Sequence, residues 1–96
     1  MKVVGRDKLD AFCAKHTDAR KWIENWLAEA ETATWSTPQQ IRNRYSSASF
    51  LRDNLVTFNV KGNAYRLEAV VAYKTGVVVV TWIGSHAAYD ARNKAR

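Results

Sequence analysis

The sequence predicts an α+β fold, with an N-terminal helical hairpin packed on one face of a small antiparallel sheet and a short C-terminal helix. Apolar residues follow helical spacing over residues 6–44, whereas the hydrophobic period changes to two from Phe50 onward. Helices followed by a run of strands are typical of this class. A chain of 96 residues has room for one domain, which we expect to span residues 1–96.

The first half of the chain predicts two consecutive helices. Gly5 can cap a helix over residues 6–15, because apolar side chains recur there at i, i+3 and i+4. Thr17 or Asp18 can cap a second helix, which runs to about residue 33. The apolar stripes are Leu9, Phe12 and Cys13 in the first helix and Ile23, Trp26, Leu27 and Ala30 in the second, with Trp22 and Trp26 interpreted as packing residues rather than a ligand platform.

A third, short helix is predicted by the segment Thr37-Pro38-Gln39-Gln40. Thr37 is suited to the N-cap position, and Pro38 to the first helical position, where its missing N–H is not needed. Gln40 can complete a capping box. We expect this helix to end near Arg44, because cations are favourable at the C-terminal end of the helix dipole.

The second half predicts an antiparallel meander followed by a helix. Residues 77–83 are apolar on both faces, so we expect this strand to be covered on both sides. Gly84 and Ser85 are predicted to end it, with Ser85 as N-cap of a helix over 86–96, and residues 1–4 can add an edge strand. The strands are expected at 50–51, 55–60, 65–73 and 77–83, with hairpin turns at 61–63 and 74–76.

The composition excludes several classes of function. A single cysteine excludes an internal disulfide, and Cys13 with two histidines is too few for a four-ligand zinc site without carboxylates. We therefore expect no metal and no cofactor. No apolar run approaches the roughly 20 residues of a membrane helix, and no secretory signal is visible. We expect a soluble, cytoplasmic protein with no membrane partner.

The positive charge is confined to one part of the chain. The formal net charge is +6, and bases and acids balance over residues 1–35, so the whole excess belongs to residues 36–96. A basic surface attracts polyanions, because neutralising phosphates releases counterions. The alternative is that the charge only aids solubility.

The residues that can carry chemistry lie in this basic half. Arg66 alternates with Leu67 in a predicted strand, so it faces the open side of the sheet if Leu67 faces the helices. His86, Tyr89 and Asp90 lie at i, i+3 and i+4 and therefore share one helical face. An imidazole, a phenol, a carboxylate and cations suit RNA strand cleavage, in which the substrate's own 2′-hydroxyl attacks the adjacent phosphorus. The chain has no Gly-rich phosphate loop and no nucleophile elbow.

Each of these residues also has a purely structural interpretation. His86 can be a cap or turn residue, and Tyr89 a packing residue with a satisfied hydroxyl group. Asp90 can form a surface ion pair of little energetic value with Arg92 or Arg66. Arg66 and Glu68 can be a solvated pair on the sheet. Spacing alone leaves these alternatives open.

Three segments of the sequence form a recognisable set: Trp35-x-x-Pro38, Phe58-Asn59-Val60-Lys61-Gly62-Asn63-x-Tyr65-Arg66-Leu67 and Gly84-Ser85-His86-Ala87-x-Tyr89-Asp90. Together they resemble the HigB family of bacterial toxins, which are halves of type II toxin–antitoxin pairs within the RelE-like group. The resemblance implies a RelE-like fold and a metal-independent endonuclease that cleaves translated mRNA on the ribosome and arrests growth. It also implies a HigA-type antitoxin with a helix-turn-helix domain, through which alone the toxin reaches operator DNA, in the bacterial cytoplasm.

The resemblance also implies roles for individual residues. Arg66 and Lys61 are expected to stabilise the pentavalent phosphate, and His86 to act as acid or base. Tyr89 can stack on a base or donate a proton, and Asp90 can orient His86 or accept the 2′-proton. RNA-binding contacts are further expected from Asn63, Arg42, Arg44 and Lys74.

The sequence departs from the family pattern at two positions. Family members often carry an arginine where this chain has Thr81 and a basic residue where it has Ala64. Losing cations from the sheet face weakens transition-state stabilisation. Two alternatives to a nuclease therefore remain, namely a non-catalytic RNA- or ribosome-binding module and an antitoxin-bound transcriptional co-repressor.

Overall fold

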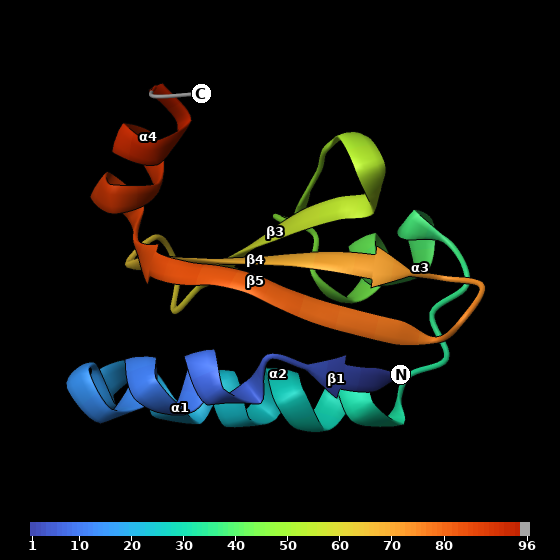
Figure 1. The fold of residues 1–96 in the computed structure, drawn as a ribbon, viewed down its shortest axis with the longest axis horizontal. Coiled ribbons are helices and arrows are strands. Elements are labelled where there is room, and N and C mark those ends of the chain that lie inside the picture. Colours follow the sequence, from blue (N-terminus) through green and yellow to red (C-terminus); the bar gives the residue numbers. More distant parts are fainter. Residues whose placement is uncertain (95–96) are drawn as a thin grey trace.

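A mixed sheet forms the middle layer of the protein (Figure 1). The computed structural model describes residues 1–94, which contain five strands in the order β1-β5-β4-β3-β2. β1 pairs with β5 in parallel, and the other neighbours are antiparallel. The prediction of an antiparallel sheet is thus wrong for the edge strand, although that strand itself was predicted. The strands are β1 (Lys2–Val4), β2 (Ser49–Phe50), β3 (Leu55–Val60), β4 (Tyr65–Ala72) and β5 (Val77–Ser85).

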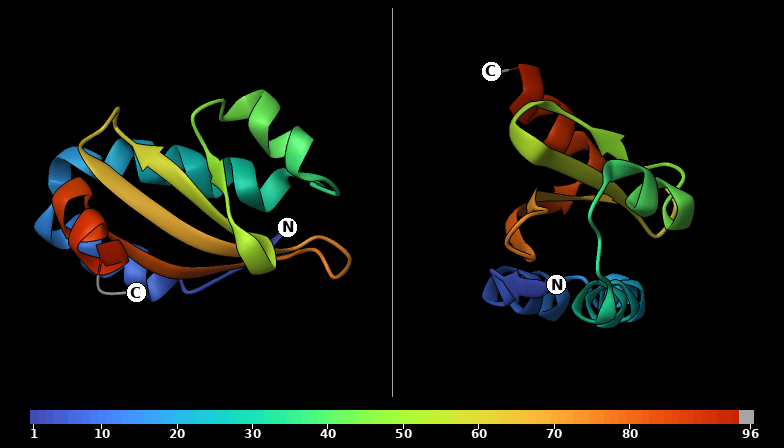
Figure 2. Two further views of the ribbon diagram at one scale, coloured as in Figure 1. Left: turned by 90° about the horizontal axis from the view of Figure 1, so that it is seen from above. Right: turned by 90° about the vertical axis from the view of Figure 1, so that its right-hand side faces the viewer.

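Helices lie on both sides of this sheet. α1 (Arg6–Lys15) and α2 (Arg20–Thr32) lie side by side along one face (Figure 2). α4 (His86–Lys94) follows β5 directly and lies on the opposite side (Figure 1). The expectation that all helices pack on one face of the sheet is therefore wrong for the C-terminal helix, which was predicted over residues 86–96; residues 95–96 lie outside the described residues. The short helix α3 (Pro38–Arg44) connects α2 to β2. None of the described helices has the length and apolar character needed to cross a membrane.

The core lies between the sheet and the pair α1 and α2. Trp26 and Phe58 are fully buried there, with their rings in a T-shaped contact at 5.4 Å between centroids. The alternation of the strands supplies the other half of this layer, because every second side chain points toward the helices. The buried strand residues are Val56, Phe58, Val60, Leu67, Ala69, Val71, Val78 and Val80.

Two helix caps and one strand end differ from the prediction. Neither Thr17 nor Asp18 caps α2, because a 3₁₀ turn at Thr17–Ala19 precedes the helix and no side chain bonds to its start. Thr37 makes no side-chain cap bond either; the Gln40 side chain instead accepts the backbone N–H of Ser36 at 2.6 Å. β5 also runs on through residues 84–85, because these pair with the start of β4.

Gly5 is required at the junction of β1 and α1. Its φ is +92°, and a Cβ atom there would lie 2.6 Å from the carbonyl oxygen of Val80. We expect Gly5→Ala to lower the free energy of unfolding by more than Gly76→Ala, which has a φ of +70° but open space around it. The control should lose only the backbone strain, about 1–2 kcal/mol. Urea unfolding of the two variants measures the difference, and equal losses would contradict the steric argument.

Candidate functional site

The face of the sheet opposite α1 and α2 carries a row of polar side chains. Phe58 and Leu67 pair across β3 and β4 and are buried in the core, so their neighbours along each strand point the other way. Strand register then fixes which side chains lie next to each other on this open face. The two cross-strand rows are Thr57, Glu68 and Trp82, and Asn59, Arg66 and Gly84.

Arg66 is the centre of this face. Its Nε donates a hydrogen bond to Nε2 of His86 at 3.1 Å, and its Nη1 donates to Oγ1 of Thr57 at 3.1 Å. The guanidinium group lies over the ring of Tyr89, 5.0 Å from the ring centroid. An arginine has five N–H donors, so these two bonds leave three donors for an anionic ligand. The contacts fix the orientation of the guanidinium group.

His86 begins α4 immediately after β5. Oγ of Ser85 accepts the N–H of Ala88 at 3.1 Å, which confirms Ser85 as the N-cap side chain. Nε2 of His86 accepts from Arg66, so the imidazole proton is assigned to Nδ1, which lies 3.8 Å from Oδ2 of Asp90. The side chains of His86 and Asp90 are 32% and 63% exposed, so this end of the cluster is open to solvent.

A buried ion pair fastens α4 to the sheet. Glu68 is only 2% exposed, and Arg92 from α4 both pairs with it and lies over the ring of Trp82 at 5.3 Å. Trp82 also contacts Tyr89, with ring centroids 5.7 Å apart. A Cβ atom on Gly84 would lie 2.7 Å from the Trp82 indole, so a glycine is needed for this packing. The ion pair therefore links Glu68 to α4 and places the helix beside Arg66.

Sequence reasoning missed four residues around this cluster. Thr57, Glu68, Trp82 and Arg92 look like ordinary members of a half-exposed sheet and a polar helix. The available signal was the alternation that puts Glu68 on the same face as Arg66. The interpretation of Glu68 as a solvated residue is wrong, because Glu68 is buried; it pairs with Arg92. Asp90 lies beside His86.

Lys61 and Asn63 lie in the β3–β4 turn, which contacts the start of α4, because the carbonyl oxygen of Ala64 accepts the backbone N–H of His86 at 3.3 Å. Lys61 forms an ion pair with Asp18 at 3.5 Å, and the Tyr65 hydroxyl group donates to the same carboxylate at 2.9 Å. The Tyr65 hydrogen bond and the nearby Lys61 lower the pKa of Asp18. Asn63 is exposed at the turn. The structure thus directs Lys61 toward the loop between α1 and α2.

The remaining predicted RNA-binding residues lie farther from Arg66. Arg42 lies over the Phe50 ring at 4.7 Å, and Arg44 pairs with Glu29 at 2.6 Å, both from α3. Lys74 lies in the β4–β5 turn, beyond the end of β4 opposite to Arg66. The structure therefore brings together Arg66, His86, Tyr89 and Asp90. Lys61 and Arg44 instead pair with Asp18 and Glu29, Arg42 lies over Phe50, and Lys74 lies at the other end of β4.

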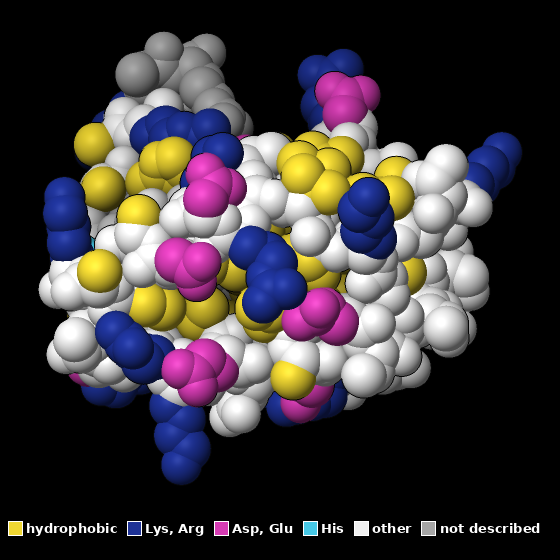
Figure 3. Space-filling model, turned by 60° about the horizontal axis from the view of Figure 1, so that its bottom comes forward, with side chains coloured by type: hydrophobic (Ala, Val, Ile, Leu, Met, Phe, Trp, Pro, Cys, Tyr) yellow, Lys and Arg dark blue, Asp and Glu magenta, His cyan; other side chains and the backbone are white. Residues whose placement is uncertain are grey.

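Charges of both signs mix on the surface formed by α1 and α2. On the side formed by α1 and α2, basic and acidic side chains are interspersed (Figure 3). This agrees with the balanced charge of residues 1–35. The net charge of +6 comes from the remainder of the chain, which also supplies Arg66 and Arg92. Residues 1–94 contain no group of three or more potential metal ligands.

Comparison with known proteins gives one family match. The family model HigB_toxin, described as the RelE-like toxic component of a toxin-antitoxin system, matches residues 19–92. The matched region starts before α2 and extends into α4, so it includes Arg66, His86, Tyr89 and Asp90. No curated protein matches the sequence.

Proposed function

Because the chain belongs to the HigB_toxin family of RelE-like toxins, we propose that it is a ribosome-associated endonuclease that cleaves translated mRNA and arrests growth. RelE-like toxins generally act as endoribonucleases. The observation that carries the proposal for this chain is the 3.1 Å contact between Arg66 and His86 on the open face of the sheet. A phosphate-binding cation and a proton-transfer group can then act on one scissile linkage.

The proposed reaction needs no nucleophile from the protein. The 2′-oxygen of the RNA forms a bond to the adjacent phosphorus while the bond from phosphorus to the 5′-oxygen breaks. A base takes the proton from the 2′-hydroxyl group, and an acid gives a proton to the departing 5′-oxygen. The products are a 2′,3′-cyclic phosphate and a 5′-hydroxyl end. The protein has to move two protons and stabilise the charge on the phosphorane.

Arg66 is suited to hold the phosphorane. Two of its donors are taken by His86 and Thr57, which orient the guanidinium group before substrate arrives. Donors that are fixed in advance stabilise developing charge without a further cost of reorganisation. The three remaining N–H groups can bind phosphate oxygens, and this is the role that we propose for Arg66.

His86 is suited to proton transfer, with Asp90 beside it. Proton transfer at Nε2 of His86 requires the Arg66 Nε–H to leave it, so the bond that orients the guanidinium group before substrate arrives is exchanged for a phosphate contact when RNA binds. Asp90 faces Nδ1 and can stabilise the imidazolium that forms. Tyr89 is only 6% exposed, because Arg66 and Trp82 cover its ring. Its burial supports a role in positioning Arg66 rather than in stacking on a base.

The family implies an antitoxin partner. We propose a HigA-type antitoxin whose helix-turn-helix domain recruits the toxin to operator DNA, with both proteins in the bacterial cytoplasm. The presence of a neighbouring reading frame for a small helix-turn-helix protein would support this assignment. Co-purification of the two proteins as a stable complex tests it, and a stably monomeric toxin in the presence of that protein contradicts it.

A second candidate is a non-catalytic RNA-binding module. It is favoured by Thr81, where the family often has arginine. Thr81 lies at an irregularity between β4 and β5, and its hydroxyl group donates to the carbonyl oxygen of Glu68 at 3.1 Å. Arg92, the neighbouring cation, is paired with Glu68. Arg66 is therefore the principal candidate for charge stabilisation among the described residues of this face.

Mapping RNA ends in cells separates the two candidates. Expression of the wild-type chain is expected to stop growth and to create new 5′-hydroxyl ends inside translated messages. The same messages made untranslatable by mutation of their start codon are the control for ribosome association. Growth arrest without new RNA ends would favour the non-catalytic module and contradict the nuclease.

RNA binding is expected to depend steeply on salt. Each phosphate neutralised on single-stranded RNA contributes about −0.7 to the slope of log affinity against log salt concentration. Arg66→Ala should make this slope shallower by about 0.7. Arg6→Ala removes the same charge from α1, where Arg6 pairs with Glu31, and should leave the slope unchanged. Fluorescence anisotropy with a short RNA measures both slopes, and a flat response in the wild-type chain would remove the electrostatic argument.

A further inference from the structure

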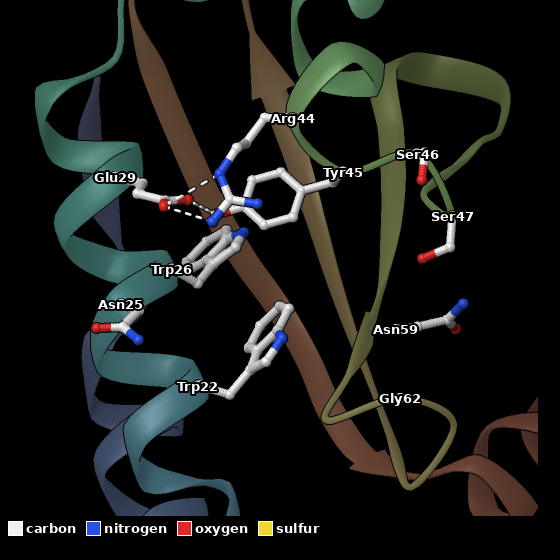
Figure 4. A pocket seen from close by; sticks show the side chains of 10 residues that line it. All are labelled: Trp22, Asn25, Trp26, Glu29, Arg44, Tyr45, Ser46, Ser47, Asn59 and Gly62. Atoms are coloured by element: carbon white, nitrogen blue, oxygen red, sulfur yellow. Dashed lines mark hydrogen bonds and ion pairs between the residues drawn. The ribbon is translucent and has the colours of Figure 1, made fainter.

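A cavity of about 310 Å³ lies between α2, the segment after α3 and the outer edge of β3 (Figure 4). It is separate from the cluster around Arg66, and none of the residues predicted for catalysis lines it. Trp22 extends from α2 toward β3 (Figure 4), and Ser46 and Ser47 of the segment after α3 also line the cavity. The polar lining includes Asn25 and Asn59.

The cavity has a hydrogen-bond donor without a partner. Trp26 is 1% exposed, and its Nε1 finds no acceptor among the described residues. Oδ1 of Asn59 is also buried and unpaired. Buried polar groups are almost always satisfied, because leaving one unpaired is costly. An unpaired indole N–H in the wall of a cavity therefore points to an acceptor on a ligand.

The other walls are aromatic and rigid. The rings of Trp22 and Tyr45 lie 6.2 Å apart, inclined at 54°. The Tyr45 hydroxyl group and Arg44 both donate to the Glu29 carboxylate. Burial alone would raise the pKa of Glu29, but these hydrogen bonds outweigh it and lower that pKa, so the carboxylate stays charged and keeps the wall in place.

The cavity lies next to the row that holds Arg66. Asn59 lines the cavity and is the register partner of Arg66 on the neighbouring strand. Neighbouring strands lie about 5 Å apart, so an RNA strand whose phosphate is bound by Arg66 has to cross only the edge of β3 to reach the cavity. β2 pairs with β3 only at residues 56–57, which leaves the edge beside Asn59 without a neighbouring strand in the described chain.

We propose that this cavity binds one unpaired nucleobase of the RNA strand whose backbone is held by Arg66, and this inference rests on the proposed function. Single-stranded RNA is recognised through splayed-out bases that stack on aromatic side chains and form hydrogen bonds at their edges. Each base has acceptors at its edge for Nε1 of Trp26 and a face for Trp22 or Tyr45. Arg44 lies at the same wall and can contact the neighbouring phosphate.

The indole N–H signals of the full chain test this site directly. Adenosine, guanosine, cytidine and uridine are titrated separately, because nucleosides carry no phosphate that could bind Arg66. At least one nucleoside is expected to give a saturable downfield shift of the Trp26 signal and a shift of the Trp22 signal. Trp35 does not line the cavity and should not move. If all four nucleosides leave Trp22 and Trp26 unchanged, the proposal is overturned.

A matched pair of variants on α2 links the cavity to RNA. Asn25 and Ala28 are both exposed, but only Asn25 lines the cavity. Asn25→Leu is expected to abolish the nucleoside shifts and the base preference at one position beside the cut, whereas Ala28→Leu retains both. Identical cut-site preferences in the two variants, with the RNA still cleaved, would overturn the cavity proposal alone. If the chain binds nucleosides but cleaves no RNA, the proposed nuclease function is contradicted, whereas the nucleobase-binding site is supported.

Discussion

Arg66→Ala is expected to abolish growth arrest and to slow RNA cleavage by about 10²–10³-fold, the usual effect of removing one preorganised donor to a developing anion. Arg66 contacts three other residues of the cluster, since it donates hydrogen bonds to His86 and Thr57 and lies over the ring of Tyr89. Thr81 and Ala64 supply no charge to replace it. Its removal therefore takes away the guanidinium group that binds phosphate and the hydrogen bond that orients His86.

Two further variants make this result specific. Arg66→Lys keeps the charge, but one ammonium group cannot reproduce the planar fork that reaches His86 and Thr57 together, so we expect an intermediate rate. Arg6→Ala removes an exposed arginine from α1 and should cleave RNA at the wild-type rate. Circular dichroism establishes that the variants are folded. Full toxicity of Arg66→Ala would show that the site is assigned wrongly.

The spacing of apolar residues along the chain predicts most of the fold. Residues 6–15 form a helix at the predicted boundaries, and the change of period at Phe50 marks the start of the sheet. These features are local, because each is set by the spacing of side chains along a few turns or strands. The parallel direction of β1 and the side on which α4 lies are not local. They depend on how β5 pairs with β1 and on the contact of Arg92 with Glu68.

The site, like the fold, was predicted only where it depends on local spacing in the sequence. Alternation placed Arg66 on the open face, and helical spacing placed His86 with Asp90, and the structure confirms both placements. Burial of Glu68 was not predictable from alternation, which gives the face of a residue but not what covers that face. The same holds for Trp26, whose packing role is confirmed but whose unpaired Nε1 becomes visible only with the cavity.

His86→Ala is expected to slow cleavage by about 10²–10⁴-fold while leaving RNA affinity nearly unchanged, because a proton-transfer group acts on the chemical step. Single-turnover cleavage at saturating protein isolates the chemical step, and RNA affinity is measured separately. The chain offers a matched control in His16→Ala, since His16 stacks on Phe12 at 4.3 Å on the other side of the protein's sheet. A single-turnover rate unchanged by His86→Ala would assign proton transfer to another group.

The hydrogen bond between Arg66 and His86 makes the two effects interdependent. Residues in direct contact do not contribute independently, so the loss in the double variant Arg66→Ala/His86→Ala should be smaller than the product of the two single losses. Without Arg66, the imidazole loses the donor that fixes Nε2, and part of its contribution is already gone. Single-turnover cleavage by the four proteins measures this coupling. Multiplicative losses would mean that the 3.1 Å contact has no role in the reaction, and that each residue would then act on the RNA by itself.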